Sequence, residues 1–176
     1  MNLEDRVKKV IRDIPDFPKP GILFKDITPI MQDFALCQDI VEHVKNQIEP
    51  LKIDGIAGIE SRGFLFGVPL AMALGVPFIL IRKKGKLPYK TVSHSYDLEY
   101  GSATVEMQIG DIKPGQRILI HDDLLATGGS ASAAAQLIKM QDGVVAGFHF
   151  LVALSFLDGE QALTNYSENI STLVHY

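Results

Sequence analysis

The sequence predicts an α/β fold, in which helices cover both faces of a mainly parallel central sheet. Short apolar segments alternate along the chain with segments of helical periodicity, and these apolar segments carry few polar residues on either face. Strands of that kind are typical of a parallel sheet that is buried on both sides. A length of 176 residues with 47% apolar residues suits one domain with a complete core. We therefore expect a single domain, residues 1–176.

The N-terminal region, residues 1–32, is predicted to hold a helix followed by a shaped loop. Asn2 can cap the helix, its apolar residues recur on one face, and Pro15 would end it. Prolines and a glycine in the loop 17–26 restrict or free the backbone, so that it can present main-chain groups. A second amphipathic helix is expected from residue 33 to about residue 48.

The rest of the chain alternates between predicted strands and helices, with one insertion. The insertion, residues 83–109, begins as a basic, flexible and irregular loop over 83–95, and two alternating segments then flank Gly101–Ser102 as a β-hairpin. A short closing strand is expected near Leu173. The other predicted elements are strand 53–59, helix 63–74, strand 78–82, strand 118–122, helix 130–141 and strand 144–155.

One uncharged stretch, Phe64–Ile81, is about long enough to be tested as a membrane span. Two glycines and two prolines interrupt it. A buried helix that ends near Gly75, followed by a buried strand from Pro77, explains these interruptions better than a helix in lipid. We therefore expect no membrane partner.

The charge balance argues against a nucleic-acid partner. The formal net charge is -4, and acidic and basic residues are interspersed, so there is no basic stripe to neutralise a phosphate backbone. The single cysteine, Cys37, cannot form a disulfide within the chain, and the first residues lack the apolar core of a secretion signal. These features favour a cytoplasmic protein.

The strongest local pattern is the segment 118–130, where an apolar strand leads into two acids and a loop of small residues that opens a helix. Glycines let the main chain approach an oxyanion, and the first N–H groups of the helix point toward it with the helix dipole behind them. Thr127 and Ser130 add hydroxyl donors, while Asp122 and Asp123 suit the neighbouring hydroxyls of a ribose. The lysine of a Walker loop and the glycine spacing of a dinucleotide fingerprint are absent. The pattern therefore predicts a site for a phosphorylated sugar.

This motif resembles that of the type I phosphoribosyltransferase family, in which a hydrophobic strand precedes two acids and a Thr-Gly-Gly-Ser/Thr loop. Segments outside the motif resemble the adenine-using members of the family, and the resemblance spans roughly residues 10–155. It implies a Rossmann-like sheet with an N-terminal hood that recognises the base. It also implies transfer of the phosphoribosyl group of 5-phosphoribosyl-1-pyrophosphate (PRPP) to N9 of adenine, giving AMP and pyrophosphate in purine salvage. The segments are Phe17–Gly21, Glu60–Phe64, Ile81–Pro88 and Leu98–Gly101.

The resemblance implies roles for individual residues. Glu99 would act as the catalytic acid or base, and Asp122 and Asp123 would hold the ribose hydroxyls. Adenine would be bound by Leu23, Phe24 and Lys25, through main-chain groups and the aromatic ring. The residues implied to bind the phosphates of PRPP are Ala126, Thr127, Gly128, Gly129, Ser130, Arg62, Arg82, Lys83 and Lys86. Arg62 also suits a phosphate on chemical grounds, because a guanidinium at a strand end can pair two oxygens.

No short spacing of histidines or cysteines indicates a metal site built by the protein, so we expect no metal ligands in the chain. Mg²⁺ is nevertheless expected, bound mainly through PRPP and pyrophosphate oxygens. His121, in the strand before the acids, is interpreted as a histidine with satisfied hydrogen bonds, either in the core or directly behind the site residues. The family resemblance further implies a homodimer in which the basic loop of one subunit reaches the site of the other.

Other functions stay open at this point. A xanthine/guanine or orotate phosphoribosyltransferase is the nearest alternative, although the loop at Leu23 favours adenine. A regulator that keeps the PRPP pocket only as a sensor is another, and Glu99 together with the acidic balance favours the enzyme. A phospho-accepting receiver domain also carries paired acids after a strand, but its acids lie early in the chain and those at 122–123 lie late.

Overall fold

The structure is a computed structural model that describes residues 1–98 and 101–176. In this part of the chain, seven strands form one sheet in the order β5-β6-β4-β3-β7-β8-β9. The predicted α/β fold with a mainly parallel sheet is confirmed, because only the hairpin strands β5 (Thr91–Leu98) and β6 (Gly101–Gln108) add antiparallel pairings. The parallel strands are β3 (Gly55–Ile59), β4 (Phe78–Lys83), β7 (Arg117–Leu125), β8 (Val144–Ala153) and β9 (Ile170–His175).

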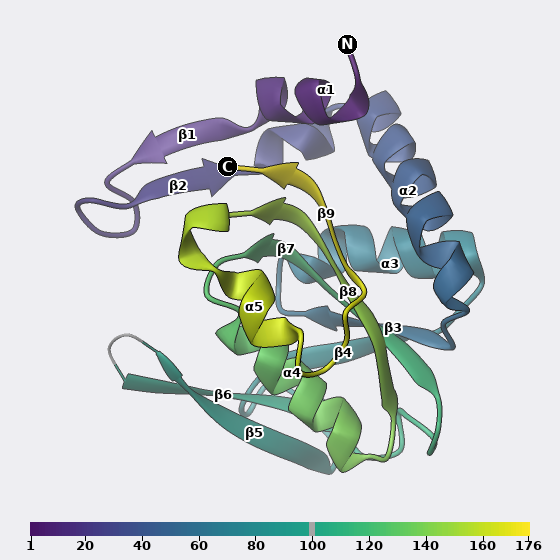
Figure 1. Cartoon of the computed structure of the whole chain (residues 1–176). Coiled ribbons are helices and arrows are strands. Elements are labelled where there is room, and N and C mark those ends of the chain that lie inside the picture. Colours follow the sequence, from purple (N-terminus) through teal and green to yellow (C-terminus); the bar gives the residue numbers. More distant parts are fainter. Residues whose placement is uncertain (99–100) are drawn as a thin grey trace.

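Helices cover both faces of the sheet (Figure 1). Strand β7 shows why two cores form, because Leu119 packs in one cluster of buried residues while its neighbours Ile118 and Ile120 pack in the other. Successive side chains of a strand point to opposite faces, so a strand in the middle of the sheet must be apolar on both. The first face carries α1 (Leu3–Val10), α2 (Phe34–Ile48) and α3 (Gly63–Leu74), and the second carries α4 (Gly129–Met140).

Local signals in the sequence set several helix ends correctly. The Asp33 side chain caps α2 by accepting a hydrogen bond from the Leu36 N–H at 2.9 Å. Gly75 ends α3 in the left-handed conformation at φ +68°, so the uncharged stretch divides into α3 and β4 as predicted. Among the described residues, no helix has the length and apolar character needed to span a membrane.

The N-terminal helix is shorter than predicted. It ends at Val10 rather than at Pro15, because residues 12–15 form β1 (Arg12–Pro15), which pairs antiparallel with β2 (Leu23–Asp26). Two ion pairs between the strands, Arg12 with Asp26 and Asp13 with Lys25, stabilise this small sheet. The pair of strands forms a hood at the upper left of Figure 1.

The hairpin and the strand with the acids also differ from the prediction. Strand β5 begins at Thr91, inside the region predicted to be irregular, and Gly101 and Ser102 begin β6 instead of forming the turn. Residues 99 and 100 lie outside the described residues, so the prediction for Glu99 is not tested. Strand β7 continues through both acids to Leu125. The short elements η1 (Thr28–Gln32), η2 (Glu49–Leu51), η3 (Ser155–Leu157) and α5 (Gly159–Leu163) were not predicted.

A close approach between β3 and β4 gives a test of the packing. A Cβ atom at Gly58 would lie 2.3 Å from Cζ of Phe78, so an alanine there must displace the ring. We expect Gly58→Ala to lower the free energy of unfolding by about 1–3 kcal/mol in urea titrations, as overpacked cores do. The cost should shrink in a Phe78→Leu background. An equal cost in both backgrounds would contradict the proposed clash.

Candidate functional site

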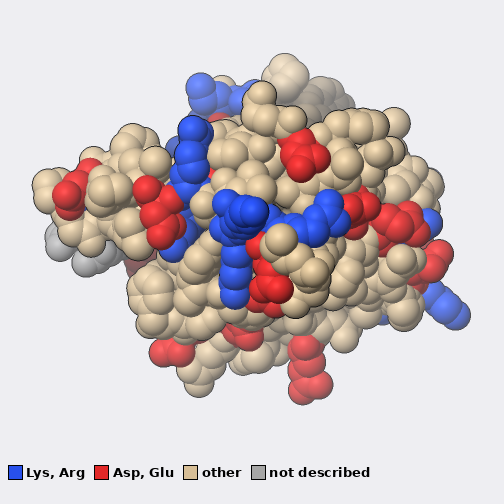
Figure 2. Space-filling model, turned by 90° about the horizontal axis from the view of Figure 1, so that it is seen from above, with Lys and Arg blue, Asp and Glu red and all other residues tan. Residues whose placement is uncertain are grey.

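A cavity of about 550 Å³ opens at the carboxyl ends of the central strands. Open α/β sheets bind ligands at this edge, where loops from neighbouring strands meet. Seen from above Figure 1, positive and negative side chains lie side by side, with Lys and Arg gathered near the centre of the face (Figure 2). The cavity is lined by Glu60, Ser61, Arg62, Lys83, Tyr96, Asp97, Phe150 and the continuous segment 122–131.

The small-residue loop between β7 and α4 forms one wall of the cavity. Gly128 has φ +83° and immediately precedes α4, so the first N–H groups of that helix face the cavity end of the loop. A Cβ atom at Gly128 would lie 2.7 Å from the Gly159 carbonyl oxygen, and one at Gly159 would lie 2.1 Å from the Ala126 carbonyl oxygen. The loop is therefore backed by the main chain of α5 at van der Waals distance. Anion binding by this loop stays a prediction.

The two acids of the motif are both buried. Asp122 and Asp123 are 8% and 5% exposed, and the Asp123 N–H donates to Oδ1 of Asp122 at 2.8 Å. Burial, and then the neighbouring Asp123 charge, raise the pKa of Asp122 well above its usual value. Oδ2 of Asp123 forms an ion pair with Nε of Arg62. The two carboxyl groups therefore differ in their environments: Asp122 has a raised pKa, and Asp123 is paired with a guanidinium.

Arg62 links the acids to the hood. Its Cζ atom lies 5.4 Å from the centroid of the Phe24 ring, which also packs edge-on against Phe17. Lys25 is turned elsewhere, because its Nζ pairs with Asp13 at 2.6 Å and lies 3.8 Å from the centroid of the Tyr176 ring. Only the main chain of Lys25 is therefore available to a ligand at the cavity. The Phe24 ring and the Arg62 guanidinium bring the predicted base-binding and phosphate-binding groups together.

The basic side of the cavity is organised by Glu60, which follows β3. Its Oε2 accepts hydrogen bonds from Nε of Arg82 at 2.8 Å and from the Lys83 N–H at 3.1 Å. Arg82 and Lys83 are consecutive in β4, so their side chains leave opposite faces of the strand. Within the described part of the chain Lys83 lines the cavity, whereas Arg82 and Lys86 do not.

Two histidines lie directly beneath the acids. His121 and His149 are fully buried, their rings stack, and their Nδ1 atoms lie 3.1 Å apart. Burial lowers the pKa of His121 to about 4, so the pair is neutral near pH 7. The prediction that His121 is a core histidine is consistent with this burial. Its Nε2 has no hydrogen-bond partner among the described residues.

Most of the predicted phosphate and ribose ligands line one cavity, but sequence reasoning missed several neighbours. Glu60 acts through long-range hydrogen bonds, and Tyr96 and Asp97 enter from the hairpin. Phe150 reaches the cavity from β8. In the segment Glu60–Phe64 the sequence pattern indicated a role for Arg62 alone. The carboxylate of Glu60, two residues earlier, is the feature of the sequence that could have indicated a partner for Arg82 and Lys83.

The fold and the cavity together are those of an α/β protein with a ligand site at the carboxyl edge of a doubly covered sheet. Residues 24–163 match the model of the phosphoribosyl transferase domain family. An adenine phosphoribosyltransferase of Cytophaga hutchinsonii is 51% identical over 99% of this chain and 96% of its own length.

Solved structures agree with this match. A crystal structure of adenine phosphoribosyltransferase from Thermoanaerobacter pseudethanolicus superposes with a TM-score of 0.95 at 46% identity, covering 99% of this chain and 100% of its own. The Saccharomyces cerevisiae enzyme, complexed with an imino-altritol bisphosphate and adenine, has a TM-score of 0.89 at 39% identity and covers 97% and 98% of the two chains. The chain belongs to the phosphoribosyltransferase family and, within it, to the adenine phosphoribosyltransferases.

The environment of Asp122 predicts a gain in stability when its charge is removed. A carboxyl whose pKa is raised by folding stabilises the fold only while it stays protonated, and that contribution is lost as pH rises through its folded pKa. We expect Asp122→Asn to be more stable than the wild type by about 1 kcal/mol near pH 8. The difference should shrink steadily toward pH 4 and close only below the unfolded-state pKa of about 3.8, where the carboxyl is protonated in both states.

Urea titrations across pH 4–8 measure this difference. Asp123→Asn is the matched control, because it removes a neighbouring carboxylate that is paired with Arg62. Asp123→Asn relieves the same repulsion but leaves the Arg62 guanidinium without its partner, so its gain at high pH should be smaller than that of Asp122→Asn. An Asp122→Asn protein that is less stable than the wild type at every pH would contradict the assigned environment.

Proposed function

We propose that the chain catalyses transfer of the phosphoribosyl group of PRPP to N9 of adenine, with AMP and pyrophosphate as products. The observation that carries this proposal is the single cavity that brings the Asp122–Asp123 pair, the phosphate loop and two cationic side chains together. The yeast relative was crystallised with adenine and a bisphosphorylated sugar analogue, which together resemble the two substrates. The enzyme serves purine salvage.

The 5-phosphate of PRPP would bind in the loop of residues 126–130. There the main-chain N–H groups at the start of α4 donate to the phosphate, and the Thr127 and Ser130 hydroxyls add side-chain donors. The ribose hydroxyls would then face Asp122 and Asp123 at the end of β7. Since Asp123 already pairs with Arg62, ribose binding places the sugar beside a guanidinium as well.

The reaction displaces pyrophosphate from the anomeric carbon, so negative charge grows on the leaving group. Arg62 and Lys83 line the cavity and would stabilise that charge, together with Arg82 at the end of β4 and Lys86 on the loop that follows. Magnesium bound to PRPP oxygens would supply further charge neutralisation. Among the described residues no cluster of three or more His, Cys, Asp or Glu side chains could hold a metal.

Adenine would bind under the hood, against Leu23, Phe24 and the main chain of Lys25. The Phe24 ring is half-buried and offers a π face, and the strand β2 carries main-chain donors and acceptors that can read the edge of the base. Glu99 would manage the purine proton as N9 attacks the sugar. Closure of the hairpin and loop over the site would exclude water that could hydrolyse PRPP.

The enzyme would act as a cytoplasmic homodimer. The groove between α2 and α3, of about 640 Å³, is bordered by apolar side chains that a second copy could cover. Phe34 of α2 and Leu65 of α3 both line this groove, and they are 75% and 43% exposed. The acid-rich balance of charge favours small-molecule substrates over nucleic acid.

An activity assay tests the function and the substrate together. The protein is incubated with PRPP, magnesium and, in separate reactions, adenine, guanine, hypoxanthine, xanthine or orotate, and nucleotide formation is followed. We expect AMP from adenine and far slower turnover of the oxo-purines and of orotate. Chelation of magnesium should abolish the reaction. Preferred use of guanine, xanthine or orotate would assign the chain to another branch.

Arg82 provides a test of the shared site. We expect Arg82→Ala and Asp123→Asn homodimers to be nearly inactive, and mixing them under subunit exchange to restore about a quarter of wild-type activity, since half of the dimers gain one intact site. Recovery requires Arg82 to act on the partner's site. Absence of recovery, in samples where mass spectrometry shows mixed dimers, would place Arg82 in the site of its own chain.

A further inference from the structure

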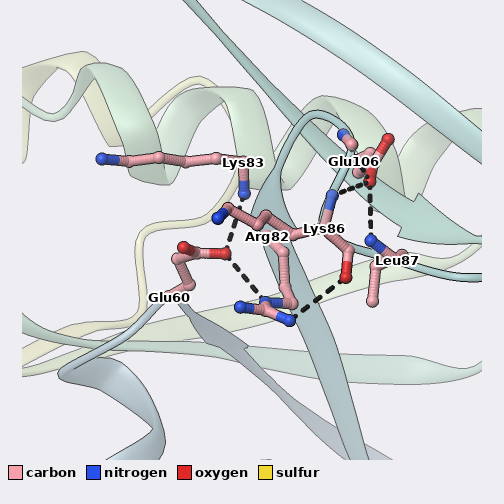
Figure 3. A network of polar contacts seen from close by, with 7 residues as sticks. Glu60, Arg82, Lys83, Lys86, Leu87 and Glu106 are labelled. Atoms are coloured by element: carbon pink, nitrogen blue, oxygen red, sulfur yellow. Dashed lines mark hydrogen bonds and ion pairs between the residues drawn. The ribbon is translucent and has the colours of Figure 1, made fainter.

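A buried carboxylate stands behind the basic loop. Oε1 of Glu106, on β6, accepts hydrogen bonds from three consecutive main-chain N–H groups, those of Gly85, Lys86 and Leu87, at 3.0, 3.1 and 3.0 Å (Figure 3). Oε2 of the same carboxylate accepts from Thr91 Oγ1 at 3.3 Å. Glu106 is 4% exposed. One side chain therefore holds the turn of the loop from the inside.

This arrangement is costly unless it is well satisfied. A buried carboxylate loses its hydration, and it is retained only where several donors replace the water. Hydrogen bonds from N–H groups to a charged acceptor are shorter and stronger than neutral ones, so the three donors fix the turn firmly. Among the described residues the other buried carboxylates are Asp122 and Asp123, which line the cavity, whereas Glu106 faces the loop.

The use of the N–H groups decides how the loop can bind an anion. The loop of residues 126–130 presents main-chain donors to the cavity, but those of residues 85–87 are directed to Glu106. Residues 85–87 of the basic loop can therefore bind an anion only through their side chains. In Figure 3 the Lys83 side chain extends away from the hydrogen-bonded network, and Lys83 lines the cavity.

A second carboxylate fixes the other end of the same loop. Glu60 accepts from Nε of Arg82 and from the Lys83 N–H, and Nη1 of Arg82 donates to the Lys86 carbonyl oxygen at 3.1 Å. Glu60 follows β3 and Glu106 belongs to β6, so the loop is braced from two strands that flank β4. The positions of Lys83 and Lys86 thus depend on both carboxylates.

We propose that Glu106 is a positioning residue for pyrophosphate: it holds the turn at residues 85–87 so that the lysine side chains of the loop meet the diphosphate group. The proposal rests on the function given above. The proposal predicts a particular direction for the change in pyrophosphate affinity when Glu106 is neutralised. Removal of a nearby negative charge would by itself strengthen the binding of an anion. Loss of the turn at residues 85–87, in contrast, would weaken the binding of pyrophosphate.

Three variants of the full chain separate these effects. Glu106→Gln keeps the shape but replaces charged acceptors by a neutral amide oxygen, and Glu106→Asp keeps the charge but is one methylene too short to reach the turn. Thr91→Val is the matched control, since it removes only the bond to Oε2. Calorimetry measures the binding of inorganic pyrophosphate with magnesium and, separately, of ribose 5-phosphate.

We expect the Kd for pyrophosphate to rise about tenfold in Glu106→Gln and in Glu106→Asp, in line with the loss of charge-assisted hydrogen bonds. The Kd for ribose 5-phosphate and the KM for adenine should stay within about twofold, because neither ligand meets the basic loop. The KM for PRPP should rise with the Kd for pyrophosphate. Thr91→Val should match the wild type in all of these measurements.

Other outcomes overturn the proposal in distinguishable ways. Tighter or unchanged pyrophosphate binding in Glu106→Gln, with weaker binding in a Lys83→Ala protein, removes Glu106 from the site and leaves the proposed function intact. Equal losses for pyrophosphate and ribose 5-phosphate show a general structural role only. Unchanged pyrophosphate affinity in Lys83→Ala and Lys86→Ala as well removes the basic loop from the pyrophosphate site and overturns the role of Glu106, whereas failure of the proposed function would show as absence of AMP formation in the activity assay.

Discussion

Two adjacent carboxylates buried at the end of β7 constrain the rest of the site. Like charges at neighbouring positions in a poorly solvated edge of a sheet cannot both be ionised without compensation. The structure compensates with the Arg62 guanidinium on Asp123 and with a main-chain N–H on Asp122. The start of α3 must approach β7 closely for this, and a Cβ atom at Gly63 would lie 2.9 Å from the His121 carbonyl oxygen. Placement of the arginine therefore depends on the acids and on the packing beneath them.

The two regions proposed to bind the phosphates of PRPP differ in their chemistry. The loop of residues 126–130 exposes main-chain donors at a helix start, which recognise a phosphate by geometry. The basic loop after β4 turns its N–H groups inward to Glu106 and presents flexible cationic side chains instead. The 5-phosphate, which stays bound to the sugar, suits the rigid main-chain donors of residues 126–130. The pyrophosphate, which must leave, suits the flexible side chains of the basic loop.

Sequence patterns predicted the elements that depend on local periodicity and missed those that depend on distant pairing. The strands of the parallel sheet are apolar on both faces, so their signal was strong, and the loop of residues 126–130 is contiguous. Ile11 and Ile14 fit helical spacing, yet residues 12–15 pair with a segment that is only adjacent after folding. Glutamate is usually an exposed residue, so nothing in the sequence distinguishes Glu60 and Glu106 from other acids. Only the tertiary contacts show which groups each carboxylate binds.

The contact between Gly128 and Gly159 has a consequence for how the protein tolerates mutation. A Cβ atom at Gly128 would meet the Gly159 carbonyl oxygen, and one at Gly159 would meet the Ala126 carbonyl oxygen, so neither glycine can gain a side chain alone. A scan of substitutions would therefore group Gly159 with the phosphate loop, although it lies in α5 and contributes no group to the cavity described above. In a graft of this loop onto another scaffold, residues 126–130 alone would be an incomplete module, and the start of α5 would have to be transferred with them.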